Sequence, residues 1–388
     1  MKRRTLIKSG IFAACAAMIG TSGCKKENEL SNNLLIPKQT KPYEIYAPMP
    51  FRYDLIDEIS KLNSQLKKSQ IKTFYNNIPR PLFSEFEENF QGPKGENNNI
   101  KTFEDFAQYV KYAKQQGYKF VYVLNSPKPF SMDVFFKYSD RLFRLIDKLE
   151  EIGCDELKIA NQQLINLISE QRPQIALSAS TSFEFHNVSQ YINLINTYPQ
   201  IKSINTAIDD NRNLVFFKNL KKKFPKVNIE IMVNEPCIHG CPARICHPSS
   251  FFAVWDCIGL KEKIGHLTYF LKSNVVYPWW LPYYQSIGIN TFKFFSVPMR
   301  ANIDTIDFLR NYLMAIENGY ENLTVQDFFN DIFYAAVPIK NNVKLTEIMP
   351  YLPQMEHFIE NAHKCSTICD IECQYCVKNV KEIEKIIS

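Results

Sequence analysis

Eight short apolar runs alternate along the chain with amphipathic segments, and this alternation constrains the fold more than any other feature. The runs are the predicted strands, Tyr43–Ala47, Ile71–Tyr75, Lys119–Leu124, Glu156–Ala160, Gln174–Ser178, Ser203–Ile208, Asn228–Val233 and Asn290–Val297. One intervening segment opens at Thr102 with Asp105 three residues later, as a helix capping box does, and stops at Gly117. Strands alternating with helices predict parallel βαβ units. Eight units predict an α/β fold, a (β/α)8 TIM-like barrel, with an open doubly wound sheet as the alternative.

The same pattern predicts the domain organisation. The barrel domain is expected over residues 43–316, with a long insertion at residues 236–288, before strand eight. The polar stretch Pro81–Ile100 reads as an insertion loop, and residues 317–388 form a C-terminal extension with a cysteine cluster.

The first 24 residues have the pattern of an export signal. A basic start containing "RRTLIK" precedes a short apolar run and the ending "TSGC" at Cys24. The first motif is typical of twin-arginine signals and the second of lipoproteins. We expect the export machinery to carry the chain to the periplasm or cell envelope, with a possible lipid anchor through Cys24 and a tether over residues 25–42. The alternative is a basic, apolar N-terminus that is simply disordered.

Charge and composition exclude two classes of protein. Hydrophobic residues make up 45% of the chain, which argues against global disorder. The net charge is +6, and removing the four basic residues of the predicted signal leaves about +2. That balance gives no electrostatic footprint for nucleic acid.

The cysteines have the spacing of metal ligands. The chain has 11, and nine remain after the predicted signal. An odd number argues against a simple, fully paired disulfide framework in an exported protein. Seven of the nine fall into two tight clusters. We therefore expect bound metal, with disulfides as the alternative in each cluster.

The first cluster reads Cys237-x-x-x-Cys241-Pro-x-Arg244-x-Cys246-His247 and directly follows predicted strand seven. Thiolates are soft ligands that suit iron–sulfur clusters or zinc. Arg244 is positioned in the motif to offset the negative charge of a thiolate-bound group or to bind an anionic substrate. In a (β/α)8 barrel, the loops after the strands build the active site, so the cluster is expected at the barrel mouth.

The second cluster lies in the extension and reads C-x3-C-x3-C-x2-C. Its members are Cys365, Cys369, Cys373 and Cys376. Four thiolates within twelve residues can hold an iron–sulfur cluster or a zinc ion by themselves.

Polar residues follow several predicted strands and are expected near one another at the barrel mouth. Glu235 and His247 are the expected proton-transfer groups, and Arg244 and Arg300 are expected to bind an anionic group. The others are Asn125, Asn161, Ser178, Ser180, Thr181, Asp209, Asp210 and Asn234. For each of these taken singly, a helix cap or loop residue is the favoured interpretation.

The stretch "VNEPCIHGCPARICH" resembles the collagenase-like peptidase family, as do "GCDELKIANQQLINLI", "IALSASTSFEFHN" and "FKFFSVPMR". That family includes iron–sulfur proteins of RNA and ubiquinone hydroxylation. The resemblance implies a barrel core and, in several members, a [4Fe–4S] cluster on four cysteines, with Cys237 and Cys241 matching the cluster-binding pair. No cysteine lies between Cys154 and Cys237, so further ligands would come from Cys246, Cys257 or the tail.

These observations lead to one expected function and two alternatives. The chain is expected to be an exported iron–sulfur protein with redox or hydroxylation-type chemistry at the barrel mouth. A peptidase or hydrolase of the same family is the first alternative, although the sequence contains no HExxH motif. A non-enzymatic envelope protein with structural zinc is the second.

Overall fold

A computed structural model describes the chain over residues 37–49, 52–76, 102–124, 132–235, 237–241, 261–294, 305–333, 342–361 and 373–387. Residues Pro37–Ser388 belong to one compact unit. Nine residues singled out in the sequence lie outside the described residues, as do the predicted export signal and the predicted loop over residues 81–100. The nine are Cys24, Asn125, Arg244, Cys246, His247, Cys257, Arg300, Cys365 and Cys369.

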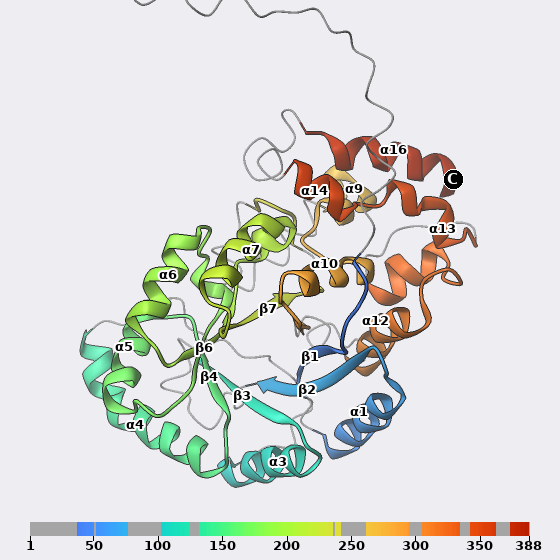
Figure 1. The fold of residues 1–388 in the computed structure, drawn as a ribbon. Helices are drawn as coiled ribbons and strands as arrows, with labels where there is room; N and C mark the ends of the chain where they lie inside the picture. Colours follow the sequence, from blue (N-terminus) through green and yellow to red (C-terminus); the bar gives the residue numbers. More distant parts are fainter. Residues whose placement is uncertain are drawn as a thin grey trace, which may run out of the picture. The chain divides into compact units, whose positions relative to one another are not determined.

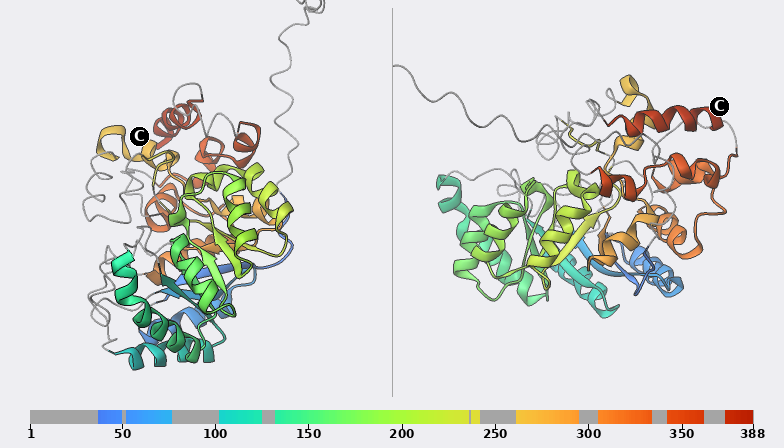
Figure 2. Two further views of the ribbon diagram at one scale, coloured as in Figure 1. Left: turned by 90° about the vertical axis from the view of Figure 1, so that its left-hand side faces the viewer. Right: turned by 45° about the horizontal axis from the view of Figure 1, so that its top comes forward.

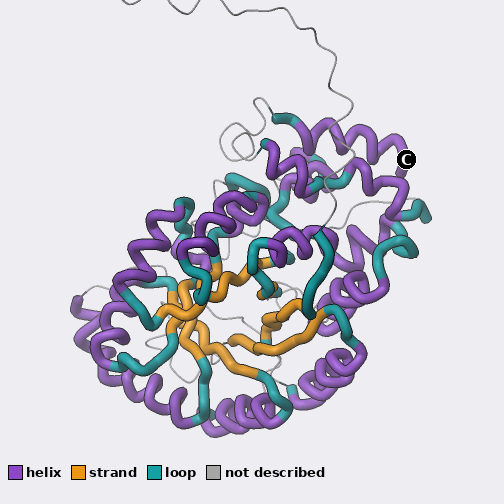
Figure 3. Tube along the Cα trace, viewed as in Figure 1, coloured by secondary structure: helices purple, strands orange, loops and turns teal. Residues whose placement is uncertain are grey.

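Eight parallel strands form a closed barrel, which confirms the predicted fold and excludes the open sheet (Figures 1 and 3). Each strand pairs with its neighbours in sequence, and β8 closes on β1 through the register Tyr46↔Lys293. The strands are β1 Tyr43–Pro48, β2 Ser69–Asn76, β3 Lys119–Leu124, β4 Glu156–Ile159, β5 Leu177–Ala179, β6 Ile201–Asn205, β7 Asn228–Met232 and β8 Thr291–Lys293.

Helices surround the strands, as Figure 3 shows. Around the barrel these are α1 Tyr53–Gln65, α3 Phe103–Gln115, α4 Met132–Glu151, α5 Gln162–Gln171, α6 Val188–Thr197, α7 Leu214–Lys223 and α12 Thr305–Asn318. Short 3-10 turns follow two strands: η2 Thr181–Phe183 and η3 Ile208–Arg212. The predicted capping box of α3 is present, because Thr102 Oγ1 accepts from the Asp105 amide at 3.1 Å and Asp105 Oδ2 from the Thr102 amide at 2.9 Å.

Side chains alternate along the strands between the apolar outer face of the barrel wall and its polar inner face. In β4, Leu157 and Ile159 belong to the main hydrophobic core, while Lys158 between them is fully buried. Successive side chains of a strand point to opposite faces. The outward residues therefore pack beneath the helices, and the inward ones bring charge into the barrel.

The insertion before strand eight contains α9 His266–Lys272, η5 Pro278–Trp280 and α10 Leu281–Ser286. The extension contains η6 Asp327–Ile332, α13 Leu345–Ile348, η7 Met349–Tyr351, α14 Met355–Glu360 and α16 Tyr375–Ile387.

The extension packs on the insertion, where α16 lies against α9 (Figure 2). Trp280 Nε1 donates to the Pro353 carbonyl at 3.1 Å, and Phe358 and Val380 share the core that contains Trp280. The extension is thus continuous with the barrel core. Within the described part of the chain, every helix is too short or too polar to span a membrane.

Candidate functional site

The Cys237–Cys241 turn lies just beyond the carboxyl end of β7, where the sequence places it. Ile238 forms an antiparallel bridge with Ser273, and the His239 amide donates to the Lys272 carbonyl at 2.9 Å. The Cys237 carbonyl accepts from the Asn274 amide at 2.9 Å. The chain after α9 therefore holds the turn at the mouth of the barrel.

Asp209, in the turn after β6, anchors the same loop from the other side. Its Oδ1 accepts from the Gly240 amide at 3.1 Å and from Asn274 Nδ2 at 2.9 Å. Asn274 Nδ2 also lies 3.1 Å from the Cys237 carbonyl, and His239 Nδ1 lies 3.5 Å from Asp209 Oδ1. Gly240 has φ +66°, a conformation that favours glycine. The segment after β6 and the segment after α9 therefore both hold the turn.

Cys237 is 3% exposed and packs with Ile208 and Met232. Its amide donates to Glu235 Oε1 at 3.2 Å, so this expected proton-transfer group also helps to shape the turn. A low-dielectric shell around thiolates is a feature of iron–sulfur sites, and two cysteines on one anchored turn fit half of a four-thiolate donor set.

Among the described residues, no three or more His, Cys, Asp or Glu side chains are arranged to hold a metal ion. The described cysteines form no disulfide with one another.

The two described tail cysteines have basic neighbours. Cys373 Sγ lies 3.7 Å from His357 Nε2, and the His357 ring stacks on Tyr375 with the centroids 3.7 Å apart. Cys376 Sγ lies 3.8 Å from Nη1 of Arg212, whose guanidinium also covers the Phe358 ring. The imidazole of His357 and the guanidinium of Arg212 thus each lie within 3.8 Å of one tail sulfur.

Arg212 connects this tail to the insertion. It is 4% exposed, its Nη2 donates to the Leu271 carbonyl at 2.8 Å, and it also donates to the Ser273 carbonyl. Ser273 is the neighbour of Asn274, which holds the Cys237 turn. The two described parts of the cysteine clusters are therefore linked through one buried arginine.

Asp210 is the strongest proton-transfer candidate among the described mouth residues. It is 8% exposed, and its Oδ2 has no hydrogen-bond partner among the described residues. Burial, with repulsion from Asp209 and Glu184, raises the pKa of Asp210 to about 7. A carboxyl group that titrates near neutrality is suited to general acid–base chemistry.

Several polar residues near the strand ends cap helices, which is the role favoured for such residues taken singly. Asn161 caps α5 by accepting from the Gln163 amide at 2.9 Å, and Asn187 caps α6. Ser180 caps η2. Trp279, Trp280 and Tyr277 pack against one another beneath the insertion.

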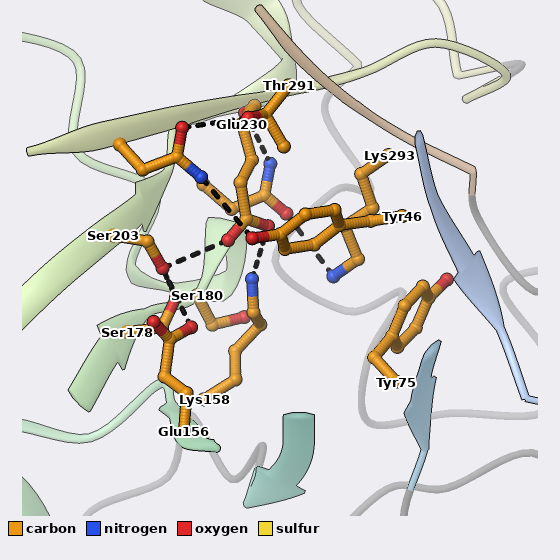
Figure 4. Close-up of polar contacts among 12 residues, drawn as sticks. Tyr46, Tyr75, Glu156, Lys158, Ser178, Ser180, Ser203, Glu230, Thr291 and Lys293 are labelled. Carbon is orange, nitrogen blue, oxygen red and sulfur yellow. Dashed lines mark hydrogen bonds and ion pairs between the residues drawn. The ribbon is translucent and has the colours of Figure 1, made fainter. Parts of the chain in front are cut away.

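A charged network fills the barrel interior, and the sequence analysis did not identify it. Lys158 of β4 forms an ion pair with Glu230 of β7, and both side chains are fully buried. Ser203 Oγ of β6 lies 3.0 Å from Glu230 Oε1, 2.8 Å from Glu156 Oε1 and 2.7 Å from Ser178 Oγ (Figure 4). The network therefore joins four neighbouring strands, β4 to β7.

Lys293, the last residue of β8, is a second lysine in this interior. Its Nζ lies 3.5 Å from Asn205 Oδ1 and 4.1 Å from the centroid of the Tyr75 ring (Figure 4). Burial, assisted by the positive charge of Lys158, lowers the pKa of Lys293 well below its usual value.

The two glutamates are shifted in opposite directions. Burial and the charge of Glu230 raise the pKa of Glu156 to about 7. Burial alone would raise the pKa of Glu230, but the neighbouring cations, Lys158 above all, lower it. Paired groups with divergent pKa values are typical of functional sites.

Comparison with known proteins gives a family-level match. The sequence model of Peptidase family U32 matches residues 93–239. An uncharacterized protease of Methanocaldococcus jannaschii is 23% identical over 251 residues, which cover 61% of this chain and 70% of the relative. The expected resemblance to the collagenase-like peptidases is thereby confirmed.

Solved structures give weaker likenesses. The U32 peptidase Mk0906 matches with a TM-score of 0.42 and 11% identity, over 67% of this chain and 94% of that one. A glycerophosphodiester phosphodiesterase from Parabacteroides distasonis matches with a TM-score of 0.35 and 9% identity, over 66% and 94%. The fold is therefore assigned from the pairing of the eight strands in this chain.

Proposed function

We propose that this chain, which matches the sequence model of Peptidase family U32 over residues 93–239, is an exported iron–sulfur enzyme that acts at the barrel mouth. The observation that carries the proposal is the anchored turn of Cys237 and Cys241. It brings two soft ligands to the barrel end where such folds place their chemistry, and Asp209 and Asn274 hold it there.

The proposed ligand set combines the turn with residues from both clusters. Cys237 and Cys241 would supply two thiolates of a [4Fe–4S] cluster, with further ligands from Cys246, Cys365, Cys369, Cys373 or Cys376. Zinc on the same thiolates is the alternative. A bound cluster would supply electron transfer or Lewis acidity.

The chain's own residues would bind the substrate and move protons. Asp210, buried and lacking a hydrogen bond to Oδ2 within the described residues, would exchange a proton with the substrate. Glu235 would shape the turn through its bond to the Cys237 amide. Arg244 and Arg300 would bind an anionic group of the substrate, and His247 would be a further proton carrier.

Peptide hydrolysis is the second candidate function, because the relative from Methanocaldococcus jannaschii bears the name of a protease. Hydrolysis with Asp210 as base would survive removal of iron, whereas the leading proposal requires the metal. A third possibility, structural zinc without catalysis, predicts that chelation unfolds the protein.

Metal analysis of the full chain tests the leading proposal. After anaerobic purification we expect iron and acid-labile sulfide in equal amounts, with an absorbance band at about 400 nm. Cys237→Ser should abolish this, whereas Cys154→Ser, which changes a thiol outside both clusters, should not. Zinc without sulfide, or metal that is retained in Cys237→Ser, would overturn the proposal that the Cys237–Cys241 turn binds an iron–sulfur cluster.

Export is tested separately. Replacing Arg3 and Arg4 with lysine should retain the chain in the cytoplasm, since twin-arginine receptors read that pair. Cys24→Ser should abolish lipid labelling. Unchanged location and labelling in both variants would remove export and anchoring from the proposal.

A further inference from the structure

Lys293 occupies a special position in the barrel interior. It is 4% exposed and is the last residue of β8, so its amine lies toward the carboxyl end of the strands. The Tyr75 hydroxyl donates to the Phe294 carbonyl, which holds the aromatic ring beside the amine. The Asn205 contact is long for a hydrogen bond, at 3.5 Å.

The carboxylate that would best neutralise Lys293 is engaged elsewhere. Glu230 pairs with Lys158 through Oε2 and accepts from Ser203 at Oε1. The titratable groups around Lys293 come from four strands: Tyr46, Tyr75, Glu156 with Lys158, and Glu230. A lysine that is desolvated and close to a second cation is activated as an amine nucleophile, because its neutral form is favoured.

We propose that Lys293 binds a small, neutral aldehyde or ketone covalently, as an imine, at the carboxyl end of β8. Neutral carbonyl compounds are favoured over keto acids, because Glu230 keeps its carboxylate charge in the same interior and already pairs with Lys158. The family match assigns no such role to this lysine, and the site does not depend on the cysteine clusters.

The step is balanced without an oxidant or reductant. The nitrogen lone pair attacks the carbonyl carbon, and a proton moves from nitrogen to oxygen to give a carbinolamine. The hydroxyl then takes the second proton of the nitrogen, and the C–O bond breaks as the C=N bond forms, so that the oxygen leaves as water. Hydrolysis reverses both steps and regenerates the amine.

Reductive alkylation of the native full chain tests the proposal. The probe is propanal with sodium cyanoborohydride at about pH 6.5, where ordinary lysines are almost wholly protonated. Peptide mass spectrometry compares Lys293 with the exposed Lys222 in the same sample. We expect Lys293 to be alkylated at least about tenfold faster, because a larger fraction of its amine is neutral.

Two variants control the measurement. Lys293→Met should lose the adduct and leave labelling of Lys222 unchanged. Cys237→Ser should leave labelling of Lys293 unchanged, which separates this inference from the proposed metal function. A Lys293 rate equal to or below that of Lys222, including no labelling, would overturn the proposal. Faster reaction with pyruvate than with propanal would overturn the assignment to neutral carbonyl compounds.

Discussion

Lys158 and Glu230 form an ion pair across the inside of the barrel, between β4 and β7, and neither side chain reaches solvent. A buried charge is stable only while its partner is present. Lys158→Met should therefore destabilise the fold by about 3–5 kcal/mol. The double variant Lys158→Met/Glu230→Leu should be less destabilised than Lys158→Met alone. Urea unfolding of the wild type and the two variants checks this, and a double variant that is destabilised as much as Lys158→Met, or more, would contradict it.

Stability should fall as pH rises from about 4.5 to 7. The pKa of Glu156 is raised to about 7 in the native state, against about 4.3 in the unfolded chain. The native state thus holds a proton that the unfolded state releases, so the stabilisation is complete below pH 4.3 and is lost as pH approaches 7. Asp210 acts in the same direction.

Glu156→Gln imitates the protonated acid and should flatten this dependence. We expect the difference in unfolding free energy between pH 5 and 7 to shrink by about 2 kcal/mol. Denaturant titrations at both pH values measure it, with Asp210→Asn as the parallel variant. If neither substitution changes the slope, other groups dominate the pH response.

Asn274→Ala should release the Cys237 turn. The side chain donates to Asp209 and to the Cys237 carbonyl, so its loss should cost about 1–3 kcal/mol and reduce bound metal. Asn63→Ala is a matched control, because Asn63 bridges to the backbone of Ile71 in the same manner but far along the chain from the turn. We expect it to lower stability and to spare the metal content. Equal metal content in both variants would count against the anchoring role.

Arg212→Lys should loosen the C-terminal helix. Lysine keeps the charge but cannot reach two carbonyls and cover Phe358 at once. Backbone amides of α16 should exchange hydrogen faster, by at least about tenfold. Arg310→Lys on the surface of α12 should leave exchange unchanged. Unaltered α16 exchange in Arg212→Lys would show that the helix is held by apolar packing alone.

The barrel could be predicted because each strand buries apolar residues beneath the helices. The spacing of apolar residues along the sequence indicates such strands and helices directly. Several boundaries differ from the prediction. Strand five is predicted to begin at Gln174 but begins at Leu177, strand six is predicted to reach Ile208 but ends at Asn205, and strand eight is predicted to reach Val297 but ends at Lys293. Ile175 and Ile208 are buried in turns. Apolar character signals burial, and burial alone does not distinguish a strand from a neighbouring turn.

The cysteine turn was predictable because it directly follows a strand, whereas the interior network was not. Glu156, Lys158, Glu230 and Lys293 each look like the polar half of an alternating strand, which normally faces solvent. Only closure of the barrel turns that face inward, and only the register between strands brings the four together. Charged residues that interrupt several short, otherwise apolar strands were the available signal.

The packing of α16 on α9 has a consequence for biosynthesis. Helix α16 leaves the ribosome after α9, yet it covers a segment made more than a hundred residues earlier. The two helices can therefore meet only after α16 has been synthesised, and until then the face of α9 that contacts α16 stays uncovered. A polypeptide truncated before residue 375 would keep that face of α9 exposed.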